Sequence, residues 1–438
     1  MSHAKTRYIA APSGRVRGEL TVPGDKSISH RALMLGGIAD GITDITGFLA
    51  GEDCLATLHA LQALGVRIER PEDQHVIVHG VGVAGLRASG SALDMGNAGT
   101  AMRLSMGLLA PQTFSSTLIG DESLMRRPME RVAVPLRLMG ADIRTRDGRP
   151  PVEIRGNPRM SGIDYRLPVA SAQVKSAILL AGLQAAGVTR VTEPAPTRDH
   201  TERMLRAFGV QVLQKDSTAS VEGGQKLRGT RITVPADFSS AAFFLVAGCL
   251  AADEPLILKN VGVNPTRTGL LDLLLRMGAD IRVHQHPTAP DSEPVADLEV
   301  RKSPLRGIEV PEALVPLSID EFPVFFIAAA CAEGETRVRG AEELRVKETD
   351  RLAAMADGLA ALGVANQLYE DGLSIRGGAG FEGGTIDSRG DHRIAMSFAI
   401  ASLRGRGPIE ILDVANVATS FPGFVALATS AGLHIETA

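Results

Sequence analysis

The chain has 438 residues, of which 44% are hydrophobic and 22% charged, and its formal net charge at pH 7 is -4. This length accommodates two or three domains, and the acidic balance argues against a dedicated nucleic-acid-binding protein, which is ordinarily basic. The longest apolar runs, residues 241–252 and 322–332, are too short to cross a bilayer, and the N-terminal segment lacks the apolar core of a signal peptide. The three cysteines show no paired spacing, which indicates buried thiols in a reducing compartment. We therefore expect a cytoplasmic protein that binds neither nucleic acid nor a membrane.

A short phrase recurs six times: an apolar residue, a glycine, another apolar residue and, usually, a β-type residue. The glycines lie roughly 70 to 85 residues apart, as in a repeat protein. They are Gly65, Gly140, Gly209, Gly278, Gly363 and Gly432. Each follows a helical pattern and precedes a strand pattern, so each is predicted to end a helix in the left-handed conformation. The chain is therefore expected to contain six copies of one unit, three in each half.

Each unit is predicted to contain a buried helix that opens after a strand and a polar or Gly/Pro turn. The six openings lie at residues 22–27, 93–97, 167–171, 234–240, 318–320 and 387–391. Each holds Ser, Asn, Asp or Thr where an N-cap is expected, and the helices that follow are apolar nearly all round. The pattern predicts an α/β fold with helices inside and sheets outside. If the buried helices of one half run parallel, their N-termini meet at one end and attract anions.

Positive side chains stand at several of the predicted helix starts, where they oppose the helix dipole. These cations are Lys26, Arg31, Arg127, Arg198, Arg267, Lys347, Arg351 and Arg393. A fold tolerates such charges more readily when an anion binds beside them, so we interpret them as a phosphate or carboxylate site. Solvated faces of capped helices are the alternative. The segment around Lys26 lacks the glycine spacing of a Walker P-loop, and Pro128 is predicted in the first turn of a helix that Arg127 opens.

Two carboxylates stand among these cations, Asp320 at the start of an apolar run and Glu348 between Lys347 and Arg351. Carboxylates in different surroundings can serve as base and acid. The sequence alone does not place these two side chains near each other.

Two further segments carry weaker signals. In residues 96–100, small residues flank Asn97 and would let a ligand approach the backbone, although a packing role explains them equally well. Residues 284–297 lengthen one repeat and are predicted to form a solvated loop. His284 and His286 lie in this insertion without a third ligand at a suitable spacing, so we expect no metal site there.

Taken together, the motifs resemble the 5-enolpyruvylshikimate-3-phosphate synthase family of the shikimate pathway, and the resemblance covers essentially the whole chain. The matching segments are PGDKSISHRAL at 23–33, GNAGTAMR at 96–103, RRP at 126–128, SAQ at 171–173, DEFP at 320–323, LRVKETDR at 344–351 and DHRIAMSF at 391–398. They occur in the order typical of that family.

The resemblance implies a two-lobed, inside-out α/β barrel of six βαβαββ units, three in each lobe. One lobe would comprise residues 23–235 and the other residues 1–22 and 236–438, with the active site in the cleft between them. The family transfers the enolpyruvyl group of phosphoenolpyruvate to the 5-hydroxyl of shikimate 3-phosphate and releases phosphate. The resemblance implies that this chain does so without a metal or an organic cofactor, and we expect it to be a monomer.

The resemblance also implies roles for individual residues. Shikimate 3-phosphate would be bound by Lys26, Ser27, Arg31, Ser171, Ala172, Gln173, Arg198, Asp320 and Lys347. Phosphoenolpyruvate would be bound by Lys26, Gly99, Arg127, Gln173, Arg351 and Arg393. Asp320 would take the proton of the 5-hydroxyl, and Glu348 would protonate the methylene carbon with the help of Lys26.

The chain departs from many relatives at a few positions. Ala172 replaces a serine, and residues 419–422 lack the lysine that some relatives place before Phe-Pro. These features resemble the branch of the family that includes glyphosate-tolerant members, but those carry alanine where this chain has Gly99. We therefore predict that glyphosate competes with phosphoenolpyruvate.

Three other functions are weighed against this reading. UDP-N-acetylglucosamine enolpyruvyl transferases usually carry a catalytic cysteine near residues 110–127, where this chain has none. A non-catalytic anion-binding protein on the same scaffold would be expected to have lost Asp320 or Glu348. An RNA-processing enzyme is disfavoured by the acidic balance and by an aromatic content of only 4%.

Overall fold

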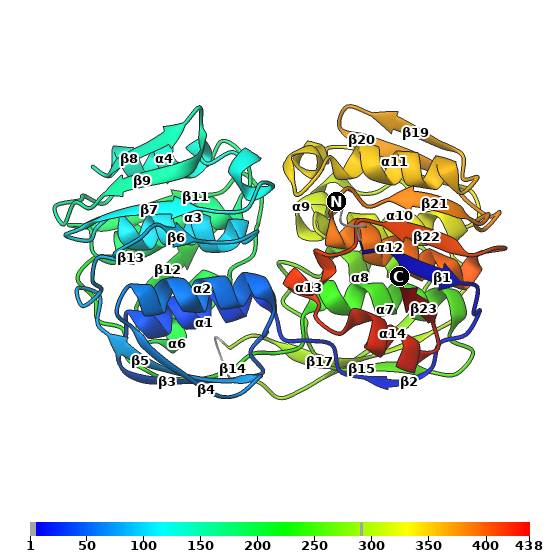
Figure 1. The fold of residues 1–438 in the computed structure, drawn as a ribbon, viewed down its shortest axis with the longest axis horizontal. Helices are drawn as coiled ribbons and strands as arrows, with labels where there is room; N and C mark the ends of the chain where they lie inside the picture. The colour runs from blue at the N-terminus through cyan, green and yellow to red at the C-terminus, as the bar shows by residue number, and fades with distance from the viewer. Residues whose placement is uncertain (1–5, 290–291) are drawn as a thin grey trace. The chain divides into compact units, whose positions relative to one another are not determined.

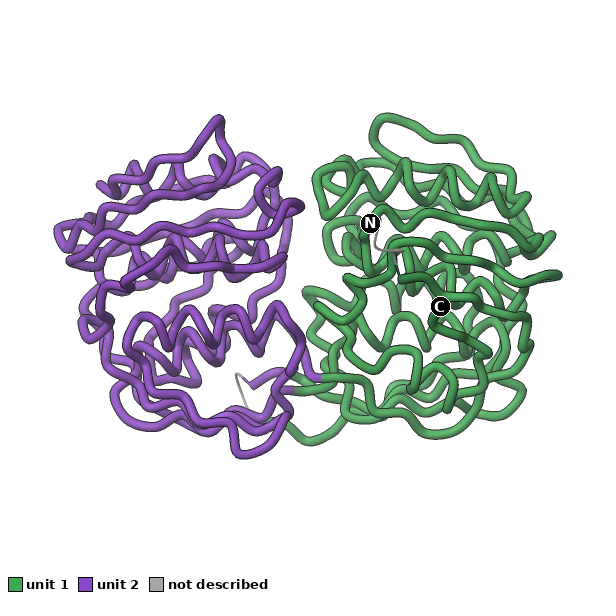
Figure 2. The backbone as a smooth tube through the Cα atoms, in the orientation of Figure 1, with its two compact units in different colours: residues 1–23, 235–288, 294–438 green, residues 24–234, 289–293 purple. Residues whose placement is uncertain are grey.

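A computed structural model of the chain describes residues 6–289 and 292–438. The chain forms two compact units, shown in different colours in Figure 2. Unit 1 comprises Met1–Pro23, Pro235–Thr288 and Pro294–Ala438, and unit 2 comprises Gly24–Val234 and Ala289–Glu293. Each unit has a separate core of buried apolar side chains.

Unit 2 contains three four-stranded sheets, ordered β14-β3-β5-β4, β6-β7-β9-β8 and β10-β11-β13-β12 (Figure 1). Its strands are β3 (Asp40–Thr46), β4 (Arg67–Glu72), β5 (His75–Val81), β6 (Leu93–Asp94), β7 (Ser115–Ile119), β8 (Asp142–Arg146), β9 (Arg149–Arg155), β10 (Asp164–Arg166), β11 (Val188–Thr192), β12 (Val212–Lys215), β13 (Thr218–Glu222) and β14 (Arg231–Thr233). Its helices are α1 (Lys26–Gly37), α2 (Glu52–Ala63), α3 (Gly99–Leu109), the 3-10 turn η1 (Leu124–Arg126), α4 (Glu130–Leu138), α5 (Ala172–Gly182) and α6 (His200–Ala207).

Unit 1 contains two four-stranded sheets, β21-β22-β1-β23 and β16-β17-β15-β2, and the three-stranded sheet β18-β20-β19. Its strands are β1 (Tyr8–Ala11), β2 (Gly18–Leu20), β15 (Leu256–Gly262), β16 (Asp280–Gln285), β17 (Val295–Arg301), β18 (Glu335–Val338), β19 (Asn366–Tyr369), β20 (Gly372–Arg376), β21 (Gly384–Asp387), β22 (Ile409–Leu412) and β23 (His434–Thr437). Its helices are α7 (Phe238–Ala251), α8 (Gly269–Arg276), η2 (Glu312–Leu314), α9 (Val315–Ser318), α10 (Phe322–Cys331), η3 (Glu342–Val346), α11 (Arg351–Ala361), α12 (His392–Ala401), η4 (Ser402–Arg404), α13 (Val417–Ser420) and α14 (Phe424–Ala431).

The predicted α/β class and the repeated unit are confirmed. The order β6-α3-β7-α4-β8-β9 is one complete βαβαββ copy, and its sheet mixes one parallel pair with antiparallel pairs. The six repeat glycines all have positive φ, between 80° at Gly363 and 114° at Gly432, as the left-handed helix ends require. None of the helices in the described part of the chain has the length and hydropathy of a transmembrane segment.

Helices occupy the centre of each unit. Every residue of α7 and of α12 is buried in unit 1, and α10 packs against both. In unit 2, α3 and α5 pack against each other in the same way, and α1 contacts α3. A helix buried on all sides needs no polar face, which explains why these segments read as apolar nearly all round.

Two strands do not pair within the unit of the helix that follows them. The strand β2 precedes α1 in the chain but pairs in parallel with β15 of unit 1. The strand β14 precedes α7 but pairs in parallel with β3 of unit 2. The chain therefore passes from one unit to the other at the two Val-Pro dipeptides, residues 22–23 and 234–235.

Side-chain capping occurs at four of the six central helices. Asp25, Ser171, Asp237 and Asp391 each accept a hydrogen bond from a backbone N–H of the first turn. The prediction was wrong for α3 and α10, whose N-cap residues, Ala98 and Glu321, make no such bond. The side chains of Asn97 and Asp320, the last residues of the predicted openings 93–97 and 318–320, contact cations instead.

Two local predictions need correction. Pro128 is not in the first turn of a helix, because α4 begins at Glu130 after the 3-10 turn η1. The insertion at 284–297 is partly sheet, since its ends belong to β16 and β17. His284 and His286 lie beside Glu299 and Asp297 of the neighbouring strand, at 3.2 and 3.1 Å. Residues 290–291 of the insertion lie outside the described residues.

Candidate active site

The first turns of α3 and α5 meet in unit 2. Gln173, in the first turn of α5, donates a hydrogen bond from Nε2 to Thr100 Oγ1 of α3 at 2.9 Å. Arg103, one turn further along α3, donates from Nη1 to Gln173 Oε1 at 2.5 Å. The Gln173 amide is therefore fixed on both sides, and the predicted ligand Gln173 stands where two helix N-termini converge.

Arg127 lies beside the same helix starts. It follows η1, is only 7% exposed, and donates from Nη2 to Asn97 Oδ1 at 2.6 Å. Asn97 in turn donates to Asp121 Oδ2 at 2.7 Å. A Cβ atom placed on Gly99, the first residue of α3, would lie 3.0 Å from Arg127 Nη1. The absence of a side chain at Gly99 therefore lets the guanidinium lie close to the backbone.

Lys26 begins α1 and forms an ion pair with Asp53, whose Oδ2 lies 2.8 Å from its Nζ. Asp53 lies in the first turn of α2, where a carboxylate is favoured by the helix dipole. Sequence reasoning missed this partner, because an acidic residue in a first helical turn has an ordinary structural explanation.

Arg31 is buried and 4% exposed, yet in the described part of the chain its hydrogen bonds all go to neutral oxygens. Its Nε donates to Thr201 Oγ1 at 2.7 Å, its Nη2 to Ser176 Oγ at 2.9 Å, and its Nη1 to the carbonyl of Ser27 at 2.9 Å. Burial lowers the pKa of Arg31 to about 10, which still leaves the group charged at neutral pH. The outer N–H groups of Nη1 and Nη2 remain available for an acceptor.

The remaining predicted residues of unit 2 lie close to these groups. Ser171 caps α5 with its hydroxyl at 3.4 Å from the Val174 nitrogen, and Ala172 is the first residue of that helix. Arg198 precedes α6, and its charge acts on Arg31.

In unit 1 the predicted residues gather around Arg351, the first residue of α11. Its Nη2 lies 2.6 Å from Glu348 Oε2, its Nε 2.8 Å from Asp391 Oδ2, and its Nη1 3.5 Å from Asp320 Oδ1. The guanidinium is 1% exposed. Burial alone would lower the pKa of Arg351, but the three carboxylates outweigh it and raise the pKa above its usual value. Two predicted catalytic carboxylates are thus held by one permanent cation.

Asp320 also faces Lys347 and Arg393. Lys347 Nζ lies 3.3 Å from Asp320 Oδ1, and Arg393 Nη1 donates to the Asp320 carbonyl oxygen at 3.0 Å. The side chains of Asp320, Lys347 and Glu348 retain 16%, 21% and 19% exposure. These three groups therefore present more surface to a ligand than Arg351, whose guanidinium is covered by its carboxylate partners.

A network of buried side chains lies next to Arg393. Glu321 Oε1 lies 3.7 Å from Arg393 Nη1 and accepts a hydrogen bond from Ser239 Oγ at 2.5 Å. Ser239 accepts from Arg267 Nη2 at 2.8 Å, and the same nitrogen donates to Asp237 Oδ1 at 2.9 Å. The sequence singled out Arg267 only as a cation at a helix start and did not predict its partners.

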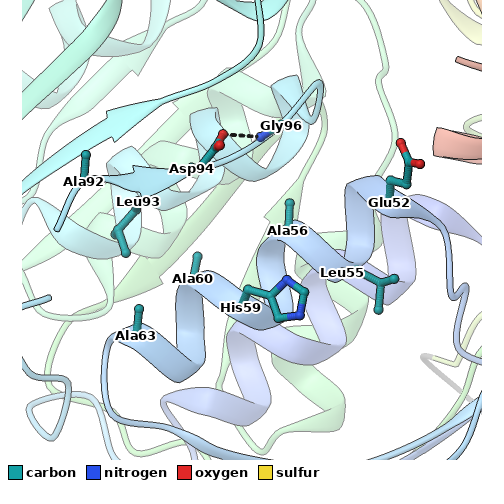
Figure 3. A pocket seen from close by; sticks show the side chains of 10 residues that line it. All are labelled: Glu52, Leu55, Ala56, His59, Ala60, Ala63, Ala92, Leu93, Asp94 and Gly96. Atoms are coloured by element: carbon teal, nitrogen blue, oxygen red, sulfur yellow. Dashed lines mark hydrogen bonds between the residues drawn. The ribbon is translucent and has the colours of Figure 1, made fainter.

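The predicted site residues thus form two groups, one on each unit. A groove of about 480 Å³ elsewhere on unit 2 contains none of them (Figure 3). It is lined mainly by alanines of α2 and by residues 92–94, and Asp94 accepts the backbone N–H of Gly96 at its edge. Within the described residues, no cluster of three His, Cys, Asp or Glu side chains has the geometry of a metal site.

Comparisons with known proteins agree with these observations. The family model for EPSP synthase (3-phosphoshikimate 1-carboxyvinyltransferase) matches residues 10–427. The 3-phosphoshikimate 1-carboxyvinyltransferases of Methylococcus capsulatus and Alkalilimnicola ehrlichii are 58% and 60% identical, over 98% of this chain and 98% and 96% of their own length. The structure of EPSP synthase from Acinetobacter baumannii, 54% identical, superposes with a TM-score of 0.88 over 99% of this chain and 100% of that chain.

A more distant structure shares the fold. The enolpyruvyl transferase NikO from Streptomyces tendae is 20% identical and has a TM-score of 0.81, over 100% of this chain and 99% of that chain. With the full-length family match and relatives above half identity, the chain belongs to the EPSP synthase (3-phosphoshikimate 1-carboxyvinyltransferase) family.

Proposed function

We propose that this protein, a transferase of the shikimate pathway, transfers the enolpyruvyl group of phosphoenolpyruvate to the 5-hydroxyl of shikimate 3-phosphate and releases phosphate. The main observation in its support is that Asp320 and Glu348, the expected base and acid, form ion pairs with the same buried arginine, Arg351. The family match supports the same reaction. The chemistry uses no metal and no organic cofactor.

We assign shikimate 3-phosphate to Lys26, Ser27, Arg31, Ser171, Ala172, Gln173, Arg198, Asp320 and Lys347. The free N–H groups of Arg31 support this assignment, because a buried cation bound only to neutral oxygens gains most from an anionic ligand. Ala172 supplies no hydroxyl, so its contact is limited to the backbone and the methyl group.

Phosphoenolpyruvate is assigned to Lys26, Gly99, Arg127, Gln173, Arg351 and Arg393. The small residue at Gly99 and the fixed position of Arg127 favour close approach of an anion to the first turn of α3. Since the two sets of residues are divided between the units, we propose that the substrates bind between them.

Asp320 takes the proton of the 5-hydroxyl while the hydroxyl oxygen attacks carbon 2 of phosphoenolpyruvate. Glu348 delivers a proton to the methylene carbon, assisted by Lys26, and a tetrahedral intermediate forms. In the elimination, the ionised Glu348 takes a proton back from the new methyl group, the double bond is restored as the C–O bond to phosphate breaks, and the proton held by Asp320 passes to the departing phosphate. Fixed cations stabilise the charge that develops on the phosphate.

Three further properties follow from the proposal. Glyphosate is expected to compete with phosphoenolpyruvate, since Gly99 carries no methyl group that would displace Arg127. We expect a monomer, because every residue assigned to the two substrates comes from a single chain. We also expect a cytoplasmic location, in keeping with the lack of a disulfide bond among the described residues, where each of the three cysteines keeps its thiol.

The test is phosphate release from the purified protein. Wild-type protein should release phosphate only when both substrates are present, and Asp320→Asn and Glu348→Gln should each lower kcat by about 10² to 10⁴. The control is Asp371→Asn, which removes a surface partner of Arg339 and should leave kcat unchanged.

Other outcomes would point to a different function. Release with UDP-N-acetylglucosamine as acceptor would favour the other enolpyruvyl transferase. Binding of both ligands without any release would favour a non-catalytic anion-binding protein.

A further inference from the structure

Two buried carboxylates lie next to the residues that hold Arg31. Glu202 follows Thr201 on α6 and is 0% exposed, and Glu193 lies just after β11 and is 8% exposed. Although Glu202 directly follows Thr201, which bonds Arg31, the guanidinium of Arg31 forms no ion pair with a carboxylate among residues 6–289 and 292–438. A buried guanidinium without a counter-ion is unusual, so the structure must direct these carboxylates elsewhere.

Both carboxylates bind Lys175 instead. Lys175 Nζ lies 2.8 Å from Glu202 Oε1 and 2.7 Å from Glu193 Oε2, and the lysine is 1% exposed. Lys175 stands beside Ser176 on α5, just as Glu202 stands beside Thr201 on α6. The helices α5 and α6 therefore each contribute to two neighbouring groups of side chains. The hydroxyls of Ser176 and Thr201 bond Arg31, and Lys175 forms an ion cluster with Glu202 and Glu193.

The electrostatics of the cluster fit this division. Burial by itself lowers the pKa of Lys175, but Glu202 and Glu193 outweigh it and raise the pKa, so the lysine stays charged. Glu202 is also the largest of the charges that offset burial at Arg31. The carboxylate of Glu202 is thus close enough to act on both cations, although it pairs with only one.

We propose that Lys175 is a positioning residue that keeps Arg31 available to an anionic group of the substrate, by holding the carboxylates of Glu202 and Glu193 away from it. The inference rests on the proposed function, in which Arg31 binds shikimate 3-phosphate. Removal of Lys175 leaves two buried carboxylates without a cation, and Arg31 is the neighbouring charge that compensates them. A compensated Arg31 binds the substrate less tightly, because the substrate must then compete with an internal anion.

Calorimetric titration of the full chain with shikimate 3-phosphate tests the proposal. Lys175→Met should weaken binding at least tenfold. Lys175→Met combined with Glu202→Gln restores the net charge of the cluster and should bring the affinity back to within about threefold of wild type. An equal loss in the single and double variants would indicate a purely structural role and overturn the proposal, as would wild-type affinity in Lys175→Met.

Two further variants guard against a general loss of stability. Leu205→Ala removes a fully buried apolar side chain from the same helix and should lower the melting temperature without changing the affinity. Glu202→Gln alone leaves Lys175 paired with Glu193 and should bind shikimate 3-phosphate at least as tightly as wild type. A tenfold loss in Glu202→Gln would overturn the proposal even if Lys175→Met did not fold.

The two levels of inference fail differently. If the wild-type protein does not bind shikimate 3-phosphate, that result contradicts the proposed function itself. Wild-type binding that none of these charge changes affects would remove only the role of Lys175.

Discussion

Arg351 organises the half of the site that lies on unit 1. It bonds three carboxylates while being almost completely buried, and its pKa is raised, so it stays charged at neutral pH. A lysine at this position would offer one compact ammonium in place of a planar fork. The orientation of Asp320 and Glu348 therefore depends on the guanidinium shape as well as on its charge.

Gly99 is expected to control the site of phosphoenolpyruvate. In Gly99→Ala the new methyl group would lie 3.0 Å from Arg127 Nη1 and 3.3 Å from Arg103 Nη1, so these buried guanidinium groups must shift. We predict a higher KM for phosphoenolpyruvate, weaker inhibition by glyphosate and an unchanged KM for shikimate 3-phosphate. Steady-state kinetics with each substrate varied would measure all three, and equal changes in both KM values would contradict the assignment.

His30 ties α1 to α2 and is fully buried, with its Nδ1 2.7 Å from Thr57 Oγ1. Burial, together with the charges of Lys26 and Arg31, lowers its pKa from 6.5 to about 3. Between these two values the unfolded chain takes up a proton that the folded chain does not, so stability falls as the pH drops below 6.5. At pH 5 this difference amounts to about 2 kcal/mol.

We therefore predict that His30→Gln loses less stability between pH 7 and pH 5 than wild type, by about 2 kcal/mol, when urea unfolding is followed by circular dichroism. The control is His59→Gln on the exposed face of α2, which should behave like wild type. An unchanged pH dependence in His30→Gln would show that other groups cause the acid sensitivity.

At the scale of elements, helix ends decide which side chains are free for function. Asp391 illustrates a double use, since it caps α12 through the Arg393 backbone nitrogen and also binds Arg351. The helices α3 and α10 have no side-chain cap, because Asn97 instead accepts a hydrogen bond from Arg127 and Asp320 instead pairs with Lys347. A cap contributes roughly 1 kcal/mol, so stability is exchanged for function at these two helices.

The repeat glycines should contribute to stability alone. Gly209 has a φ of 87°, and a Cβ atom there would meet nothing within 4 Å, so only the backbone conformation opposes substitution. Gly209→Ala should lower the free energy of unfolding by about 1 kcal/mol, and Gly209→Asn should lower it by less. Denaturant titration would measure both, and kcat should not change. A cost for asparagine equal to that for alanine would argue against the left-handed conformation as the cause.

At the scale of the whole molecule, the two units are linked by strands that precede a helix of one unit and pair in the other. The chain therefore crosses between them next to these strands, at residues 22–23 and 234–235, and it crosses again at residues 288–289 and 293–294. Paired connections of this kind permit a hinge motion while both sheets stay intact.

Substrate-driven closure follows from the proposal that the ligands bind between the units. We predict that shikimate 3-phosphate together with glyphosate lowers the radius of gyration in small-angle scattering. Shikimate, which lacks the phosphate, should have a smaller effect and serves as the control. Scattering curves that stay the same with both ligands would count against closure.

Local features of the chain were readable from its sequence. This holds for the six glycines, the apolar central helices and the α/β repeat. Each depends on residues close together in the chain, and such residues determine the local backbone conformation and the hydrophobic periodicity. The family resemblance was readable for the same reason, since each motif is a short continuous segment. The position of Lys26 and Arg351 at helix starts also followed from local pattern.

Only the tertiary structure decided which group each charge contacts. Several ion pairs join residues that are far apart in the sequence or lie on different helices. They are Lys26 with Asp53, Lys175 with Glu202 and Glu193, and Arg351 with Asp391. The same holds for the strands β2 and β14, whose partners lie in the other half of the chain. The physical reason is that a hydrogen bond or ion pair depends on distance in space, and packing, which brings these side chains together, is a property of the whole fold.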